Sequence, residues 1–302
     1  MKILYKITRI FANIFAVIFG VVFVVSIIAN ENASAVSGAL NTKTYEKIED
    51  EFAWLEDSMY YPTDYVDESG NGQFTALKAA TDELCRQVVA EGIVLLKNEN
   101  ALPLQKGASV NLYSSSSVNF VYAGSGSSAN THASYVSLYD ALKDKFSVNK
   151  ELWDWYAAHP EYSGTRANGQ DVIPDINDAP WNDIDTSSKS KKADAAIFVL
   201  SRYGGEGEDL ISYGGNTSDM TQGDYLQLSP NEISVLENLK KLKDEGTVGK
   251  IIVLMNSANQ VQCDFADDAK YGIDALLWVG EVGSTGTKAI ADILDGTVNP
   301  SG

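Results

Sequence analysis

The chain has 302 residues, enough for one large domain or two modest ones. Its 41 acidic and 23 basic residues give a formal charge of −18, which disfavours a nucleic-acid partner because phosphate binding depends on cationic side chains. The two histidines and two cysteines stand in no metal-ligand spacing, so we expect no metal site and no cofactor.

The amino-terminal residues predict a membrane-spanning helix. Residues 1–9 carry basic side chains, and residues 10–29 are almost entirely apolar. A helix rising ~1.5 Å per residue crosses a ~30 Å hydrocarbon layer in this length. A cleaved signal peptide is the alternative, with Ala33-Ser34-Ala35 as a cleavage site, but its apolar part usually has only ~7–15 residues. We therefore expect a single-pass membrane protein with residues 1–9 in the cytoplasm and the rest of the chain extracytoplasmic.

The next segment, residues 30–75, is polar and acidic, with aromatic residues from Trp54 to Tyr65. We expect a juxtamembrane linker whose aromatic rings pack against the protein's own domain. Sugar binding by these rings is the less common alternative.

Residues 76–302 alternate between helix and strand patterns. The strands expected here are fully apolar, which indicates a sheet buried on both faces. The fold class is therefore predicted as α/β, a mostly parallel sheet with helices on both faces. The expected helices are 76–90, 230–245 and 285–294, and the expected strands are 110–113, 195–200, 251–255 and 275–279.

Ligands of open parallel sheets bind beyond the carboxyl ends of the strands. The loop after strand 195–200 is the most informative, because it holds Glu206, Glu208 and Asp209 among glycines, with Arg202 nearby. Such a loop can bring a carboxyl group close to a ligand. A solvated acidic loop is the plainer interpretation in a chain of charge −18.

Two other catalytic or binding patterns are weak. The turn Gly124-Ser125-Gly126 resembles part of a dinucleotide fingerprint, but the rest of that pattern is missing. A serine hydrolase is disfavoured because the chain lacks a Gly-x-Ser-x-Gly pentapeptide, and both His132 and His159 are expected at the surface or in turns.

Several motifs, in order, resemble the α/β-sandwich domain of glycoside hydrolase family 3, the β-glucosidase-like enzymes. They are Glu91 to Glu99 followed by Leu102-Pro103-Leu104, the turn at Gly124, the Gly-Glu-Gly-x-Asp loop 205–209, the helix start at Leu228-Ser229, the strand 251–256 and the ending Asn299-Pro300-Ser301-Gly302. The resemblance covers residues 76–302.

The resemblance implies a retaining β-glycosidase in which Glu206 is the general acid/base and Arg202 and Asp209 bind substrate. Its substrate would be a β-linked oligosaccharide or glucoside. Members of the family take the aspartate nucleophile from a separate β/α barrel, and such an enzyme needs its two carboxyl groups ~5–5.5 Å apart. Residues 76–302 are too few to include a barrel of ~250 residues.

We therefore expect a barrel after Gly302 and no activity from the 302 residues alone. Glu208 and Asp209 are the alternatives for the acid/base if the loop register differs. Leu210, where relatives often have arginine, and the insertion 211–225 leave the substrate preference open. A membrane-tethered module that binds carbohydrate without cleaving it is the alternative function.

Overall fold

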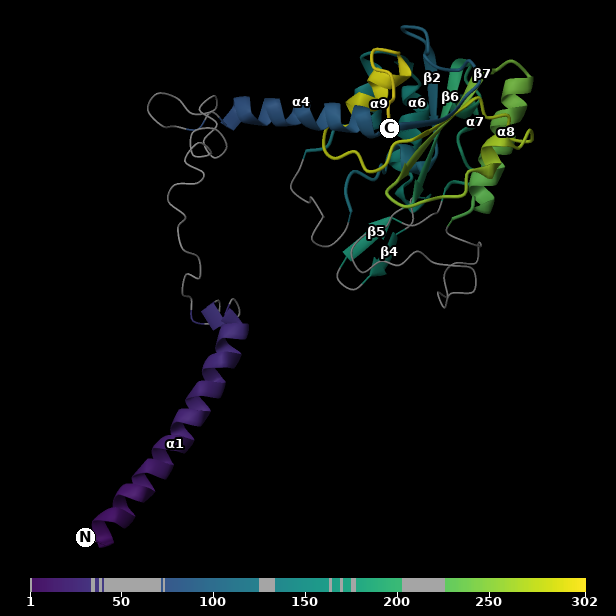
Figure 1. Ribbon diagram of the computed structural model, residues 1–302. Coiled ribbons are helices and arrows are strands. Elements are labelled where there is room, and N and C mark those ends of the chain that lie inside the picture. Colours follow the sequence, from purple (N-terminus) through teal and green to yellow (C-terminus); the bar gives the residue numbers. More distant parts are fainter. Residues whose placement is uncertain are drawn as a thin grey trace. The chain divides into compact units, whose positions relative to one another are not determined.

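The computed structural model describes residues 2–33, 36–37, 40, 72, 74–124, 134–162, 165–168, 171–174, 178–202 and 226–302. The chain divides into two compact units, Met1–Gln73 and Phe74–Gly302 (Figure 1). The aromatic segment Trp54 to Tyr65 and His132 lie outside the described residues, as does the segment 203–225 with Glu206, Glu208 and Asp209.

The first unit contains one long helix, α1 (Lys2–Glu31). Within it, the stretch Tyr5–Glu31 reaches a mean hydropathy of 2.7. The most apolar residues of this stretch are not buried against other described parts of the chain. The helix therefore has the length and composition to cross a membrane. A signal sequence near the amino terminus has the same properties.

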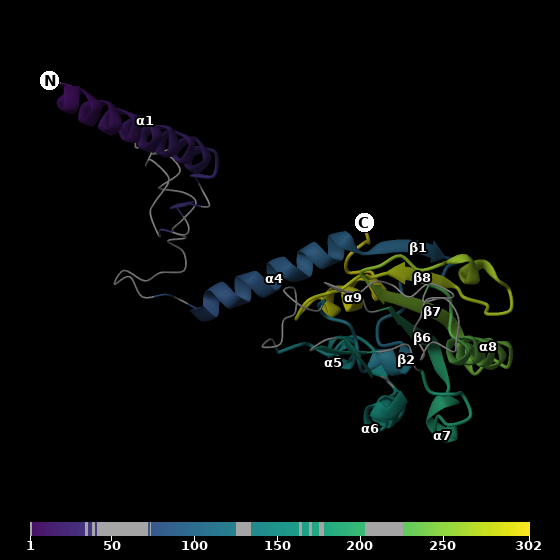
Figure 2. The same cartoon turned by 90° about the horizontal axis from the view of Figure 1, so that it is seen from below.

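The second unit is built on a six-stranded sheet of order β1-β8-β7-β6-β2-β3, most of which is seen in Figure 2. Neighbouring strands are parallel, except that β1 runs antiparallel to β8. This arrangement confirms the predicted α/β class. The strands are β1 (Val94–Asn98), β2 (Ser109–Tyr113), β3 (Ser147–Val148), β6 (Ala193–Arg202), β7 (Val248–Ser257) and β8 (Ala275–Trp278).

The central strands are buried on both faces, which explains their apolar sequences. In β6, Ala195, Ile197 and Val199 face one core, while Ala196, Phe198 and Leu200 face the other. Helices α5 (Leu138–Lys143) and α9 (Thr287–Leu294) contribute to the first core. Helices α6 (Lys150–Ala158) and α8 (Pro230–Asp244) contribute to the second.

Smaller or peripheral elements lie around the sheet, among them three 3-10 helices, η2 (Ser115–Ser117), η4 (Pro160–Tyr162) and η5 (Asp264–Asp267). Helix α4 (Phe74–Gly92) packs on α9, and the short α7 (Thr186–Lys189) lies beside α6. A separate hairpin joins β4 (Thr165–Asn168) and β5 (Asp171–Pro174).

The start of α8 forms as its sequence predicts. The Ser229 side chain accepts a hydrogen bond from the backbone N–H of Glu232, and the Glu232 carboxylate accepts one from the N–H of Ser229. This reciprocal cap satisfies two amides that a helix start otherwise leaves without partners. Sequence analysis predicted this helix at 230–245, and the observed helix ends one residue earlier, at Asp244.

Candidate functional site

The carboxyl ends of β6, β7 and β8 lie next to one another. Arg202 pairs in register with Ser257, and Met255 pairs with Trp278. The Trp278 indole N–H donates to the Ser257 carbonyl oxygen at 2.7 Å, which ties the ends of β7 and β8. Because loops that leave this edge carry ligand sites in parallel sheets, it is the place to look for function.

Asn256 joins the loops at this edge. Its side chain is fully buried and donates from Nδ2 to the carbonyls of Val121 (2.8 Å) and Gly280 (2.7 Å). Its Oδ1 accepts from the N–H of Val121 (2.6 Å) and from the Ser201 hydroxyl (3.0 Å). One amide thus connects the ends of β6 and β7 to the segments that follow β2 and β8.

Arg202 ends β6, and its side chain is buried rather than open to solvent. Its two terminal nitrogens donate to the two carboxylate oxygens of Glu232 at 2.8 and 2.9 Å. They also donate to the carbonyls of Ser201 (2.8 Å) and Gln227 (2.6 Å). The predicted contact between Arg202 and substrate remains a prediction.

Glu206, the predicted acid/base, lies outside the described residues, as do Glu208 and Asp209. Their roles therefore remain predictions. The structure does describe Arg202 immediately before that segment and Leu226 immediately after it. Both ends of the predicted catalytic loop are consequently known.

A buried carboxyl group, Asp178, lies near the same edge. Its Oδ1 accepts from the backbone N–H groups of Ser115 (2.9 Å) and Ala179 (2.8 Å). Burial raises the pKa of Asp178 to about 6, with the Glu232 carboxylate adding to the effect and the hydrogen bonds opposing it. Among the described residues, its Oδ2 and the buried Tyr156 hydroxyl have no hydrogen-bond partner. Sequence analysis had no signal for Asp178, because Ser115 and Glu232 are distant along the chain.

The raised pKa of Asp178 makes part of the protein's stability depend on pH. The pKa of Asp178 is about 6 in the native state, whereas its ordinary value is 3.8. Between these two pH values the native state binds more protons than the unfolded state, so the native state gains stability as the pH falls through this range. We expect D178N, which keeps one acceptor oxygen, to be more stable than wild type at pH 7 by about 1–3 kcal/mol. Urea unfolding should show this advantage shrinking toward pH 5. An advantage equal at both pH values would contradict the assignment.

Glu281 follows β8 and is a second carboxyl group that the structure singles out. Burial raises its pKa, and its Oε1 has no hydrogen-bond partner in the described part of the chain. Sequence analysis had no reason to select it, because a single acidic residue after a strand is common in an acidic chain.

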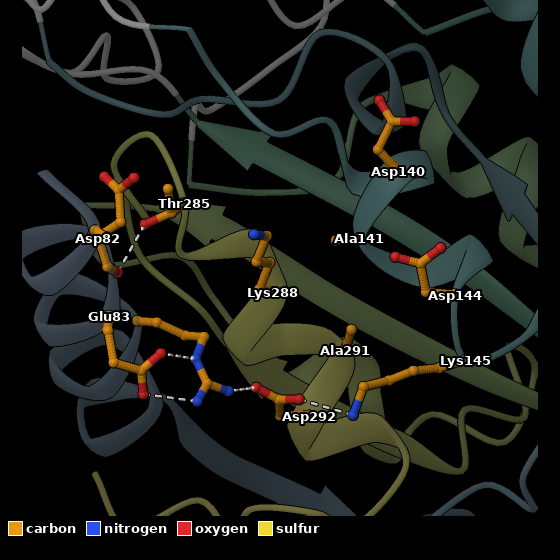
Figure 3. A pocket seen from close by; sticks show the side chains of 12 residues that line it. Asp82, Glu83, Asp140, Ala141, Asp144, Lys145, Thr285, Lys288, Ala291 and Asp292 are labelled. Carbon is orange, nitrogen blue, oxygen red and sulfur yellow. Dashed lines mark hydrogen bonds and ion pairs between the residues drawn. The ribbon is translucent and has the colours of Figure 1, made fainter. Parts of the chain in front are cut away.

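The helices on the first core border a cavity of about 500 Å³, lined by α4, α5 and α9 (Figure 3). Four of its charged side chains are linked in a network. Arg86 bonds to Glu83 and Asp292, and Asp292 also pairs with Lys145 at 2.7 Å. The network ties α4 and the segment after α5 to α9, so we assign this cavity a structural role.

The architecture and the ordered motifs can be compared with known proteins. The model of the glycosyl hydrolase family 3 C-terminal domain matches residues 93–302. The chain belongs to this family. The matched region begins just before β1 and includes every strand of the six-stranded sheet.

Curated relatives agree with the family 3 assignment. The chain is 28% identical over 226 residues to a β-glucosidase of Ruminococcus albus, covering 73% of this chain and 22% of that protein. It is also 28% identical over 252 residues to β-glucosidase A of Butyrivibrio fibrisolvens, covering 77% and 29%. This family 3 chain therefore spans less than a third of these relatives.

Solved structures of β-glucosidases are also similar to this family 3 domain. β-Glucosidase 3B of Thermotoga neapolitana, in a complex with glucose, aligns with a TM-score of 0.59 at 26% identity over 77% of this chain and 31% of that one. A β-glucosidase of Paenibacillus barengoltzii aligns with a TM-score of 0.59 at 26% identity over 72% and 23%.

Proposed function

We propose that this chain is the α/β part of a retaining β-glycosidase and that Glu206 is its general acid/base. Support comes from the family match over residues 93–302 together with the position of the Gly205-Glu206-Gly207 motif, which begins three residues after β6 ends at the carboxyl edge of the sheet. The β-glucosidases among the relatives favour a β-glucoside or β-linked oligosaccharide as substrate.

The acid/base role has a clear chemical requirement. A retaining glycosidase needs one carboxyl group to protonate the leaving oxygen and a second to attack the anomeric carbon. We propose that Glu206 supplies the first and that an aspartate of a barrel domain supplies the second. The relatives, which are more than three times as long as the matched segment, have room for such a domain. Asp209 is proposed to bind substrate.

We also propose how the chain is organised at the membrane. Residues 1–9 form a cytoplasmic flank, residues 10–29 a retained anchor, residues 30–75 a linker and residues 76–302 the extracytoplasmic family 3 domain. The apolar helix Tyr5–Glu31 supports the anchor by its length. The basic residues before it support the orientation, since cationic flanks remain in the cytoplasm.

The test is hydrolysis by the chain with and without a barrel. We expect residues 1–302 alone to release no measurable p-nitrophenolate from p-nitrophenyl β-glucoside, because the attacking carboxylate is missing. The polypeptide read in frame past Gly302 into a barrel is expected to release it. Turnover by residues 1–302 alone would contradict the divided site. An inactive two-domain polypeptide that still binds the glucoside would favour a carbohydrate-binding module instead.

A further inference from the structure

Helix α4 has two faces of different character. The face toward the domain is held by Arg86, which bonds to Asp292, and by Val89, which packs against the first core. The opposite face carries four exposed apolar side chains, Phe74, Leu77, Leu84 and Val88 (75%, 40%, 60% and 62% exposed). The described part of the chain leaves this row, called the α4 stripe below, open to solvent. In Figure 2, α4 extends beyond α9, so the stripe is accessible to another molecule.

The spacing of the α4 stripe is that of a coiled coil. Counted with Thr81, its positions advance by 3, 4, 3 and 4 residues, the alternation that keeps one helix facing another along its length. A helix that only covers a globular core usually has a broader apolar face. The stripe ends at Val88, because the next position in this spacing is Glu91, in the last turn of the helix. The spacing therefore predicts a helical partner that runs alongside α4.

A second copy of this chain meets the requirements for that partner. In a parallel pair each position of the stripe faces its own equivalent, so the stripe is complementary to itself. The flanking positions Ala80, Cys85 and Gln87 are uncharged, and Lys78 is paired with Asp82 of its own helix. Two copies of a chain of charge −18 can therefore meet along this face without repulsion at the flanks.

The α4 stripe is too small to hold two soluble molecules together firmly. The 19 residues of α4 span about 28 Å, and one helix face of that length covers less than the ~800 Å² per partner that a stable interface buries. Helix α1 of the same chain is long and apolar enough to cross a membrane. Two copies in one bilayer, in the membrane organisation proposed above, share an orientation and a high effective concentration, which favours a parallel pair.

We propose that two copies of this chain pair through the α4 stripe, with their α4 helices parallel. Leu77 and Leu84 of one copy then face Leu77 and Leu84 of the other. A lipid surface is the weaker candidate, because both basic residues of α4, Lys78 and Arg86, are engaged in ion pairs, whereas interfacial helices present basic side chains to the lipid headgroups. The inference concerns assembly and is independent of the role of Glu206.

Disulfide trapping of residues 1–302 in lipid vesicles tests the pairing. Every variant carries C85S, which removes the exposed native thiol. L77C places a thiol in the α4 stripe, and T75C, also at an exposed position, places one on the other side of the helix as the matched control. With helix axes about 10 Å apart, facing Leu77 Cα atoms lie about 5 Å apart and the Thr75 Cα atoms about 14 Å apart. A disulfide requires a Cα separation below ~7 Å.

We expect L77C to form a disulfide-linked dimer at least about tenfold faster than T75C, because only its thiols lie within bonding range. Adding L84E to L77C puts like charges opposite each other in the stripe and should lower the rate to that of T75C. Adding T75E to L77C puts the same charge on the other side and should leave the rate unchanged. Equal rates for L77C and T75C, or no effect of L84E, would overturn the inference.

Two further results would assign the α4 stripe to another occupant and also overturn the pairing. If L77C forms no dimer and its thiol is shielded from a water-soluble maleimide in vesicles, the stripe contacts lipid. If L77C dimerises in residues 1–302 but not in the two-domain polypeptide, the stripe belongs to the contact with the barrel. None of these results depends on glycosidase activity, so the pairing and the proposed function can fail separately.

Discussion

Replacing Glu206 by glutamine in the two-domain polypeptide is expected to lower kcat/KM for a β-glucoside with a poor leaving group by about 10²- to 10⁴-fold, because the variant loses its proton donor and keeps its size. The same change should have less effect on an activated aryl glucoside, whose leaving group departs without a proton. Initial rates over a series of aryl glucosides measure this dependence on leaving-group pKa.

The neighbouring carboxylates provide the control for Glu206. Glu208→Gln removes a charge from the same glycine-rich loop and is expected to keep most of the activity, as it carries no proton to the leaving oxygen. If E208Q, or the corresponding Asp209→Asn, loses activity on poor leaving groups while E206Q retains it, the acid/base belongs to that residue instead.

Replacing Asn256 by alanine is expected to destabilise the family 3 domain by about 3 kcal/mol or more, the largest effect on stability that we predict. Four hydrogen bonds are lost in a fully buried place, each contributing about 1 kcal/mol, and the N–H of Val121 is left without its partner. Urea unfolding followed by tryptophan fluorescence measures the change.

Two further variants test whether the hydrogen bonds of the Asn256 amide, rather than the volume of its side chain, account for this loss of stability. Asn256→Asp keeps the shape but directs a carboxylate at the carbonyls of Val121 and Gly280, so it should be at least as harmful as alanine. Asn238→Ala removes two side-chain bonds at the less buried surface of α8, one to the Ser234 carbonyl and one from the Lys241 ammonium, and should cost about 1 kcal/mol or less. Equal losses for N256A and N238A would contradict the role assigned to Asn256.

Much of the fold could be predicted because its signals are local. The apolar runs at 195–200 and 251–255 lie in β6 and β7, and the cap at Ser229 starts α8. Strand β1 was not predicted. It is an antiparallel edge strand directly after α4, and its apolar residues end at Leu96, before Lys97 and Asn98, so its apolar run is shorter than those of β6 and β7.

The candidate site was only partly predictable. Motif order led to Glu206 and Arg202, and the roles it implied for them remain predictions, whereas the contact of Arg202 with Glu232 had no signal in the sequence. The importance of Asn256 and Asp178 came from packing. A single asparagine after a strand, or one aspartate in an acidic chain, does not differ in sequence from residues at the surface.

The sequence by itself determined the class of this protein: an α/β domain of a glycosidase family with a mostly parallel sheet, preceded by an apolar helix. Hydrophobic periodicity, helix caps and ordered motifs are local properties that a linear chain displays. Only the tertiary structure decided that Arg202 meets Glu232, that the Asn256 amide makes its four hydrogen bonds, and that Asp178 is buried. The bonds of Asn256 and the contact between Arg202 and Glu232 join residues 24 to 135 positions apart, so they exist only once the sheet and its helices have packed.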